Sequence, residues 1–459
     1  MKMASAVAPR AFAVLWKDLD RWVIPSSLLL RRTLPAGWSN VRVGSLVQQV
    51  TTRIKVEAER EYRMAGVKWY GEGVFHRETV RGDQMSASQV TPLIPGALIY
   101  NRLFAWKASF AVVPPDFSGC YVSNEFPQFI PDTSRLLPEY LYLFCVQATT
   151  IRAVNAASTG SAAVSRNRFK EEYFLDFEIA LPPVTEQKAI VARWLKAQGE
   201  IAAARQRVEK RQAEIDARLF VDLGLQLPNS GKMPKAFAIR WTEVERWGVQ
   251  IVWLNARGAT KSAFEEVRLS ELCAIGSGGT PSRQRSNYYG GGIPWVKTTE
   301  VRNEIILSTE ETLSEEGLRN SSAKIYPKGS LIIAMYGQGA TRGRTAKLGI
   351  DAATNQACAV LSNISDRIDV DFLWYFLMSQ YDNMRLLASG NNQPNLNAEM
   401  IANLLIPLPP IGKQKQIVER VAAGRAQIAR ERQAADTLAK DIHTDIEALI
   451  LGARTLNTN

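Results

Sequence analysis

The sequence predicts an α+β protein of two tandem, pseudo-symmetric modules, each followed by a long helix, with the two helices pairing as an antiparallel coiled coil. Two observations carry this prediction. Segments at both ends of the first half of the chain recur in the second half at nearly equal offsets, and each half ends in a stretch with an apolar residue every seven positions. The 459 residues, 46% hydrophobic and 22% charged, suffice for about three folded domains.

The internal repeat is visible at the start and the end of each half. Residues 12–22 are FAVLWKDLDRW and residues 237–247 are FAIRWTEVERW, an offset of 225. Residues 181–193 are LPPVTEQKAIVAR and residues 408–420 are LPPIGKQKQIVER, an offset of 227 with eight of thirteen positions identical. The stretches between these anchors differ. A duplicated frame with divergent surface loops suits two modules that bind different targets.

Each module is expected to mix short strands with a buried helix. Apolar runs bounded by Gly and Pro predict strands at residues 97–100, 110–113, 330–335 and 357–361. PEYLYLFCVQATT at residues 138–150 and DFLWYFLMSQYDNMR at residues 371–385 each predict one buried helix. The polar stretch NSGKMP at residues 229–234 is predicted to link the two halves.

The two long helices are predicted to begin after the Leu-Pro-Pro motifs, because proline ends a strand and suits the residues before a helix. Positions spaced by seven form the expected coiled-coil seam: Trp194, Ile201, Val208 and Ile215 in the first helix, and Val421, Ile428, Ala435, Ile442 and Leu449 in the second. So narrow a stripe favours helix pairing, although a helix lying on its own domain's core is the common alternative. Tandem copies related by a pseudo-two-fold axis would pair these helices head to tail. At 1.5 Å per residue, about 35 residues would span ~50 Å.

Charge and reactive residue types narrow the possible functions. Lys and Arg exceed Asp and Glu by 56 − 45 = 11, which favours a polyanionic partner. Four scattered cysteines without a CxxC pair, and two histidines far apart, predict reduced thiols and no metal site. We find no signal peptide, no apolar run near the ~18 residues of a membrane span, and no phosphate-binding or dinucleotide motif. We therefore expect a cytoplasmic chain with no catalytic residues.

The candidate binding residues lie in loops that combine Arg, Lys, Gln and Asn with aromatic side chains. Arg matches guanine edges or phosphate, Gln matches adenine, and glycine lets backbone approach a ligand. The candidates in the first half are Lys68, Trp69, Asn101, Arg102, Lys107, Arg166 and Arg168. Those in the second half are Lys297, Thr298, Tyr336, Gln338, Arg342, Arg344, Asn391, Asn392 and Gln393. An ordinary polar turn is the alternative for each loop, and a core position is the alternative for Trp69.

With these motifs the chain resembles the specificity subunit of Type I restriction–modification systems. Two divergent modules are each followed by LPPxxxQKxIVxR and a long helix. Further matching segments in the second half are GGTPSR from Gly278, GGIPWVKTTEV from Gly291, MYGQGATRGRTAKLGIDAATNQAC from Met335 and SGNNQPNLN from Ser389. The first half contributes GVKWYGEGVF from Gly66, IYNRLFAWKASF from Ile99 and SNEF from Ser123. The resemblance covers almost the whole chain, from about Phe12 to Leu451.

The resemblance implies a domain organisation and a DNA-binding role. Target-recognition domain 1 would occupy residues 1–180, the central conserved helix 181–225, a linker 226–236, target-recognition domain 2 237–407 and the C-terminal conserved helix 408–459. Each domain would recognise half of a bipartite, asymmetric site in the major groove of double-stranded DNA, and the coiled coil would set the spacing. DNA contact is carried over to Lys297, Gln338, Arg342 and Arg344 in one module, and to Lys68, Asn101, Arg102 and Lys107 in the other.

The resemblance also implies partners and an anti-phage defence role. Two methyltransferase (modification) subunits would bind the chain and use S-adenosylmethionine to methylate adenine, and restriction/motor subunits would use ATP and magnesium to translocate and cut DNA. The chain itself would bind no cofactor. Three alternatives stay open: a coiled-coil scaffold whose modules bind proteins, a self-sufficient nuclease or methyltransferase, and the specificity subunit of another methylation-based defence system.

Overall fold

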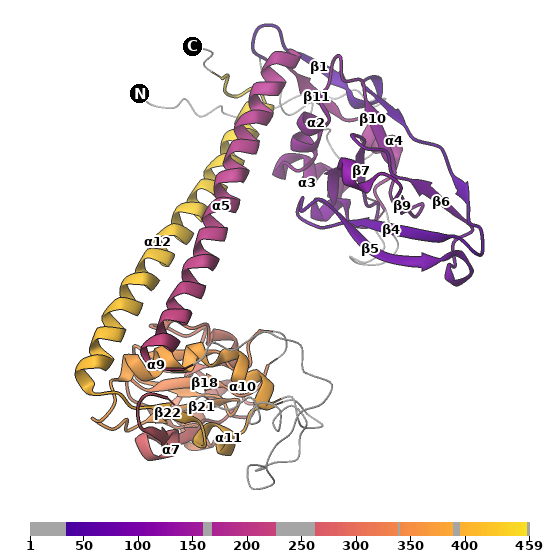
Figure 1. Ribbon diagram of the computed structural model, residues 1–459. Coiled ribbons are helices and arrows are strands. Elements are labelled where there is room, and N and C mark those ends of the chain that lie inside the picture. Colours follow the sequence, from indigo (N-terminus) through magenta and orange to yellow (C-terminus); the bar gives the residue numbers. More distant parts are fainter. Residues whose placement is uncertain (1–33, 159–167, 226–261, 338–339, 389–394, 457–459) are drawn as a thin grey trace. The chain divides into compact units, whose positions relative to one another are not determined.

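The computed structural model describes residues 34–158, 168–225, 262–337, 340–388 and 395–456. The chain divides into two compact units, one formed by Met1–Ala204 with Ala434–Asn459 and the other by Arg205–Gln433. Each unit contains one mixed module of strands and short helices and a part of both long helices (Figure 1). We call the described residues 34–181 the N-module and residues 262–408 the C-module. The predicted linker at 226–236 and both copies of the FAxxW segment lie outside the described residues.

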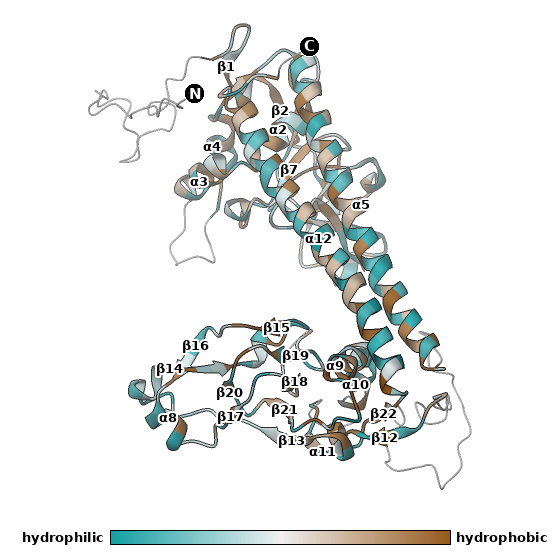
Figure 2. Ribbon diagram, turned by 90° about the vertical axis from the view of Figure 1, so that its left-hand side faces the viewer, coloured by the Kyte–Doolittle hydropathy of each residue, from teal (hydrophilic) through white to brown (hydrophobic). Residues whose placement is uncertain are grey.

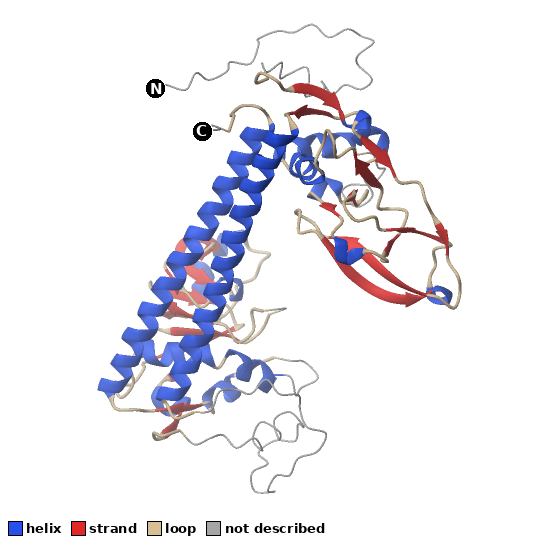
Figure 3. Cartoon of the chain, turned by 45° about the horizontal axis from the view of Figure 1, so that its top comes forward, coloured by secondary structure: helices blue, strands red, loops and turns tan. Residues whose placement is uncertain are grey.

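The described residues of the N-module form three sheets, and Figure 3 shows their strands in red. The first pairs β1 (Ser39–Arg42) with β11 (Glu178–Leu181) in antiparallel register, with Val41 opposite Ile179. The second has the order β2-β10-β7-β8 and the third β3-β6-β9-β4-β5. Their strands are β2 (Val47–Gln49), β3 (Ile54–Lys55), β4 (Glu61–Val67), β5 (Val74–Arg81), β6 (Gln89–Pro92), β7 (Leu98–Tyr100), β8 (Phe110–Val112), β9 (Tyr121–Val122) and β10 (Gln128–Pro131). The helices are α2 (Pro138–Cys145), α3 (Ala148–Ala157) and α4 (Glu171–Leu175).

The C-module likewise has three sheets. Its first sheet pairs β12 (Glu266–Arg268) with β22 (Leu405–Pro407), and the others have the orders β13-β21-β18-β19-β15 and β16-β14-β20-β17. The strands are β13 (Ala274–Ser277), β14 (Tyr289–Val296), β15 (Ile305–Ile306), β16 (Glu311–Leu313), β17 (Ile325–Tyr326), β18 (Leu331–Ala334), β19 (Thr345–Leu348), β20 (Ala352–Thr354) and β21 (Cys358–Ser362). The helices are α7 (Leu269–Leu272), α8 (Glu315–Arg319), α9 (Val370–Ser379), α10 (Tyr381–Ala388) and α11 (Ala398–Ala402).

The two modules share one sheet topology although their sequences differ. The antiparallel order β2-β10-β7-β8 recurs as β13-β21-β18-β19. In the mixed sheet, β4 pairs parallel to β9 and antiparallel to β5, as β14 pairs parallel to β20 and antiparallel to β16. The N-module adds β3 and the C-module adds β15. The prediction of a duplicated α+β architecture is confirmed.

All four predicted strands are present, as β7, β8, β18 and β21. The prediction of a single buried helix in each copy is wrong, because each copy contains two helices. In the N-module the break falls before Gln147, whose extended backbone precedes α3 and whose buried amide donates to the Leu143 carbonyl. In the C-module it falls at Gln380, between α9 and α10. The side-chain amide of Gln147 satisfies a carbonyl that a continuing helix would have used.

The long helices are α5 (Val184–Asp222) and α12 (Ile411–Ile450). Seven of the nine predicted seam side chains are buried, and Trp194 and Ile215 are half-buried. Within Arg205–Gln433, Ile215 of α5 lies opposite Gly424 of α12, and Arg211 lies opposite Glu431. Residue numbers therefore fall along α12 as they rise along α5, so the two helices are antiparallel. Within the first unit, Arg193 of α5 donates to Asp445 of α12 at 2.5 Å. The remaining surface of both helices is largely hydrophilic (Figure 2), as a narrow seam requires.

The ends of the helices also pack on the modules, so the alternative of a helix lying on its own core is partly correct as well. Ile201 of α5 and Ile442 of α12 belong to the core that contains Tyr100 and Phe129 of the N-module. Val421 of α12 belongs to the core that contains Phe372 of the C-module. The four cysteines are free and buried. No helix among the described residues has the length and apolar character needed to cross a membrane.

The shared LPPxxxQK motif has a structural role that is the same in both copies. Gln187 and Gln414 are fully buried near the starts of α5 and α12. Gln187 accepts a hydrogen bond from the Leu137 N–H and donates to the Arg135 and Pro182 carbonyls. Gln414 accepts from the Asp369 N–H and donates to the Arg367 and Pro409 carbonyls. Each glutamine therefore ties the start of a long helix to the loop that precedes α2 or α9.

Candidate nucleic-acid interface

In the N-module, the β4–β5 hairpin tip lies against the loop that follows β7. The Tyr70 N–H donates to the Lys107 carbonyl at 2.8 Å, and the Gly71 N–H donates to the Ala108 carbonyl at 2.9 Å. The Tyr142 hydroxyl of α2 donates to the Gly71 carbonyl at 2.8 Å. Gly71 has φ +72°, and a Cβ there would lie 2.6 Å from that hydroxyl, so both conformation and space require glycine. These bonds fix the hairpin tip relative to α2 and the 101–108 loop.

This contact brings together predicted residues from two distant segments. The ammonium of Lys107 lies 3.7 Å from the centre of the Trp69 ring, a cation–π arrangement, and the Trp69 and Phe104 rings lie 5.1 Å apart. Trp69 is 42% exposed, so the alternative of a core position for it is not what the structure shows. Lys68 is exposed and forms an ion pair with Glu72 at 3.9 Å. Trp69, Lys68 and Lys107 thus form one basic, aromatic surface.

The two predicted arginines of the N-module that the structure describes, Arg102 and Arg168, are paired with carboxylates. Arg102 binds Glu171 of α4 through two hydrogen bonds and also donates to the Asn124 carbonyl. Arg168 donates to Glu125 at 2.7 Å. The bonds of Arg102 join the loop after β7 to α4 and to the loop before β10. The bond of Arg168 joins the segment before α4 to the loop before β10. Arg102 is mostly buried in its pair, whereas Arg168 keeps an exposed side chain.

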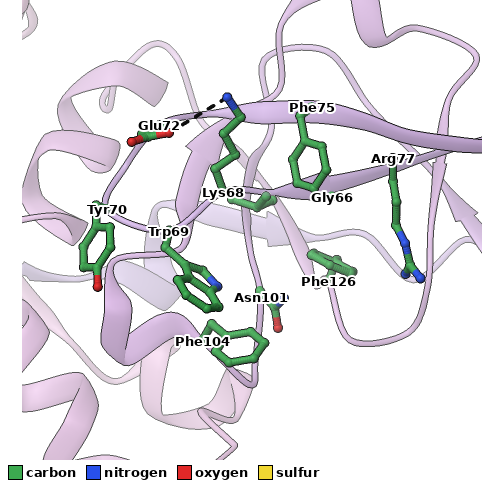
Figure 4. Close-up of a pocket in the computed structure, with 11 residues that line it drawn as sticks. Gly66, Lys68, Trp69, Tyr70, Glu72, Phe75, Arg77, Asn101, Phe104 and Phe126 are labelled. Carbon is green, nitrogen blue, oxygen red and sulfur yellow. Dashed lines mark ion pairs between the residues drawn. The ribbon is translucent and has the colours of Figure 1, made fainter. Parts of the chain in front are cut away.

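A pocket of about 600 Å³ opens between the hairpin and the 101–108 loop (Figure 4). Asn101 lines it and keeps its amide oriented by accepting a hydrogen bond from the Leu103 N–H at 3.0 Å. Eight of the eleven lining residues were absent from our predicted site residues, among them Tyr70, Phe75, Arg77 and Phe126. The first three lie within or just beyond GVKWYGEGVF, where aromatic residues alternate with glycines. Phe126 ends the SNEF segment. Only the fold shows that these two segments face one pocket.

In the C-module, Lys297 and Arg283 share one carboxylate. Lys297, which precedes the 3₁₀ turn that begins at Thr298, binds Glu311 at 2.9 Å and Glu310 at 3.0 Å. Arg283 donates to Glu311 at 2.5 Å and lies over the Tyr289 ring at 4.5 Å from its centre. The hydrogen bond from Arg283 and then that from Lys297 hold the pKa of Glu311 at about 2. Arg283 ends the GGTPSR motif and was absent from our predicted site residues.

The loop after β18 carries the remaining described candidates. Tyr336 is 39% exposed. Arg342 and Arg344 flank Gly343 (φ +84°) in a turn closed by the Arg344 N–H and the Thr341 carbonyl at 3.1 Å. The Nε of Arg342 is buried and has no hydrogen-bond partner among the described residues. Neither Arg342 nor Arg344 forms an ion pair with a carboxylate in the part of the chain that the structure describes.

Helix α12 supports this turn through a chain of hydrogen bonds. Arg425 donates to the Asn303 carbonyl at 2.7 Å, and the Asn303 side chain accepts from the Thr345 N–H at 2.9 Å. The Thr345 hydroxyl accepts from the Trp374 indole at 3.1 Å. Burial lowers the pKa of Arg425. Arg425 thus links the long helix to the residue that directly follows Arg344.

Several predicted residues lie outside the described residues: Arg166, Gln338, Asn391, Asn392 and Gln393. Among the residues that the structure describes, no group of three or more His, Cys, Asp or Glu side chains is placed to hold a metal ion.

Comparison with known proteins gives consistent matches. A family model described as the Type I restriction modification DNA specificity domain matches residues 261–438. The MjaIX specificity subunit of Methanocaldococcus jannaschii is 26% identical over 169 residues, 35% of this chain and 37% of that protein. The EcoR124I/EcoR124II specificity subunit of Escherichia coli is 26% identical over 162 residues, 34% of this chain and 40% of that protein. The chain thus matches about two fifths of the length of these two relatives.

Two further matches extend over nearly the whole chain. The MjaVIII specificity subunit of Methanocaldococcus jannaschii is 24% identical over 449 residues, 93% of this chain and 95% of that protein. A solved chain from work on complex assembly and conformational transition of the type I R-M system has a TM-score of 0.53 at 18% identity, covering 91% of this chain and 98% of that one. The structural likeness shows that the fold is shared.

Proposed function

Because this chain belongs to the specificity subunits of Type I restriction–modification systems, we propose that it recognises a bipartite, asymmetric sequence in double-stranded DNA, one half-site per module. The repeated sheet topology carries this proposal. The order β2-β10-β7-β8 recurs as β13-β21-β18-β19, while the loops that follow β7 and β18 differ entirely in sequence. One scaffold with two unlike sets of exposed loops suits two unlike DNA words.

The chemistry of these loops supports DNA as the ligand. Arg342 and Arg344 can supply planar donor groups to guanine edges or phosphate. Lys68 and Lys107 flank an exposed Trp69 and can contact phosphate while the aromatic ring contacts bases. The protein scaffold alternative does not require such cations beside an open aromatic surface. Since several cations would meet phosphates, the affinity should fall steeply as salt concentration rises.

We further propose that the paired helices α5 and α12 set the spacing of the two half-sites and, with the modules, dock two methyltransferase subunits and the restriction subunits. S-adenosylmethionine, ATP and magnesium would act on those partners, and this chain would contribute no catalytic residue. The relatives are specificity subunits, which supports this division of labour. A role in another methylation-based defence system would keep the same DNA-recognition function with different partners.

The first test is the adenine methylation map of DNA from cells that co-express this chain with its methyltransferase subunit. We expect a motif of two short, unlike words separated by a fixed gap. Methylation of a single continuous word, or a stable complex that neither methylates nor binds DNA, would contradict the proposal. The second outcome would favour the protein scaffold.

A second test assigns each half-site to a module. The double variant Arg342→Ala, Arg344→Ala should relax one word of the methylation motif and leave the other word and the gap unchanged. Loss of a base-contacting arginine costs about 1–3 kcal/mol of discrimination at the affected position. The exposed Arg319→Ala in α8 is the matched control and should leave both words intact. A change in both words would show that the modules do not recognise DNA separately.

A further inference from the structure

The pocket of the N-module has a lining that suits a planar, uncharged ring. The rings of Trp69, Phe75, Phe104 and Phe126 line it. Its volume of about 600 Å³ lies within the range of small-molecule sites, and it is open to solvent on one side. Groove contacts to paired bases need an exposed side chain and no such cavity. An aromatic pocket beside Lys68 and Arg77 therefore needs a separate explanation.

The polar groups at the pocket are few and oriented. Asn101 lines the pocket and uses its Oδ1 to accept from the Leu103 N–H, which leaves its Nδ2 to donate elsewhere. That Nδ2 has no acceptor among the described residues, so it can donate to a ring nitrogen or carbonyl oxygen within the pocket. Arg77 lines the pocket on one side of Phe75, and Lys68, with Glu72 as its ion-pair partner, lies on the other side (Figure 4). A ring attached to an anionic backbone would meet both kinds of group.

The pocket is also held rigidly. Its walls come from the β4–β5 hairpin and from the loop after β7, which are joined by the Tyr70 and Gly71 backbone bonds and the Tyr142 hydroxyl. Tyr70 itself has φ +56°, a left-handed conformation that bulky residues rarely adopt, and its side chain is 72% exposed. Backbone strain of this kind persists where the surrounding structure enforces it, and it is concentrated at ligand sites.

We propose that this pocket receives one nucleobase rotated out of the duplex within the half-site bound by the N-module. The base would stack against Trp69 and Phe104, and the Asn101 amide would donate to its edge. Lys107 and Lys68 would contact the adjoining phosphates. This inference rests on the proposed DNA-recognition function and adds an unstacked base to it.

A mismatch scan tests the proposal on the assembled complex with its methyltransferase subunit. Duplex oligonucleotides carrying the mapped motif are prepared with a single mismatch at each position in turn, and binding is measured by competition. Extrusion costs less when the base is already unpaired, so one mismatch in the N-module half-site, at a position other than the methylated adenine, should tighten binding about tenfold. Mismatches in the C-module half-site, apart from its methylated adenine, should weaken binding, because groove recognition needs the intact pair. If every mismatch away from the methylated adenines weakens binding, the pocket does not hold an extruded base.

Variants then connect the effect to the pocket. Phe104→Leu keeps apolar bulk and removes the stacking ring, so it should abolish the tightening by the mismatch and weaken binding to matched DNA by about tenfold. Phe117→Leu, in the same module but outside the pocket lining, is the matched control and should retain the tightening. A tightening that survives Phe104→Leu would place the extruded base elsewhere and overturn the proposal. Absence of sequence-specific binding by the intact complex would instead refute the proposed function itself.

Discussion

Replacement of Gln414 by leucine should destabilise the C-module while preserving the shape of the side chain. Gln414 has no exposed surface and makes three hydrogen bonds to backbone groups, with Asp369, Arg367 and Pro409. Leucine can make none of them, so one N–H and two carbonyls lose their partner. The N–H belongs to the residue that caps α9, so the start of that helix should loosen first.

The size of the effect follows from the three bonds. A buried hydrogen bond contributes about 1 kcal/mol net, and leaving a buried group unpaired costs about 1–3 kcal/mol, so the loss should be at least about 3 kcal/mol. Gln416, two residues further along α12, is exposed, and Gln416→Leu is the matched control. It should change the free energy of unfolding by no more than about 0.5 kcal/mol.

Hydrogen exchange with mass spectrometry is the assay, because two modules need not unfold together. Gln414→Leu should speed exchange of the amides at the start of α9 and leave the N-module unchanged, whereas Gln187→Leu should do the reverse around α2. Urea unfolding of each variant then gives the free energy. A loss below about 1 kcal/mol for Gln414→Leu would refute the claim that these three bonds hold the helix to the module.

Three other predictions concern the C-module and the long helices. The pKa of Glu311 lies at about 2, below its usual 4.5, so the stability that its ionised form contributes is present above pH 4.5 and lost as pH falls toward 2. In the wild-type chain the urea midpoint should fall over this pH window, and Glu311→Gln should make that fall smaller. An equally large reduction in the exposed Glu315→Gln would contradict the assignment to Glu311. Arg425→Met should speed hydrogen exchange in the turn around Gly343 and weaken DNA binding about tenfold, with little change in melting temperature. Unchanged hydrogen exchange in that turn would refute the link between α12 and the turn. Ile428→Asp places a charge at a buried seam position and should destabilise the helix pair by about 3 kcal/mol or more in thermal unfolding, whereas the exposed Ala429→Asp should not.

Sequence and structure agree most closely on the elements that repeat. The two Leu-Pro-Pro motifs, the heptad positions from Trp194 to Leu449 and the offset of 227 predict both long helices and their antiparallel pairing. These features are local or periodic, so a single chain reveals them without knowledge of its fold. The helix pairs α2–α3 and α9–α10 were predicted as single helices because their apolar pattern continues through the break. The buried amide of Gln147 that satisfies the end of α2 cannot be distinguished from an ordinary helical glutamine in the sequence.

For the candidate site as well, the sequence supplies part of the information and the structure supplies the rest. The sequence marks Trp69 and Lys107 as candidates but not as neighbours, since they lie on segments joined only by the packing of the hairpin on the loop. It also treats Arg102, Lys297 and Arg344 alike. The structure distinguishes them, because Arg102 pairs with Glu171, 69 residues away, and Lys297 pairs with Glu311, 14 residues away.

The sequence by itself thus determined the duplication, the helix pair and the kinds of side chain available for binding. Residue identity, local periodicity and internal repetition are enough to specify these features. Tertiary structure alone decided which cations stay available for a ligand and which aromatic rings line a pocket. Both depend on contacts between residues distant in sequence, such as Arg102 with Glu171 and Phe126 with the hairpin, and no local pattern encodes their distance.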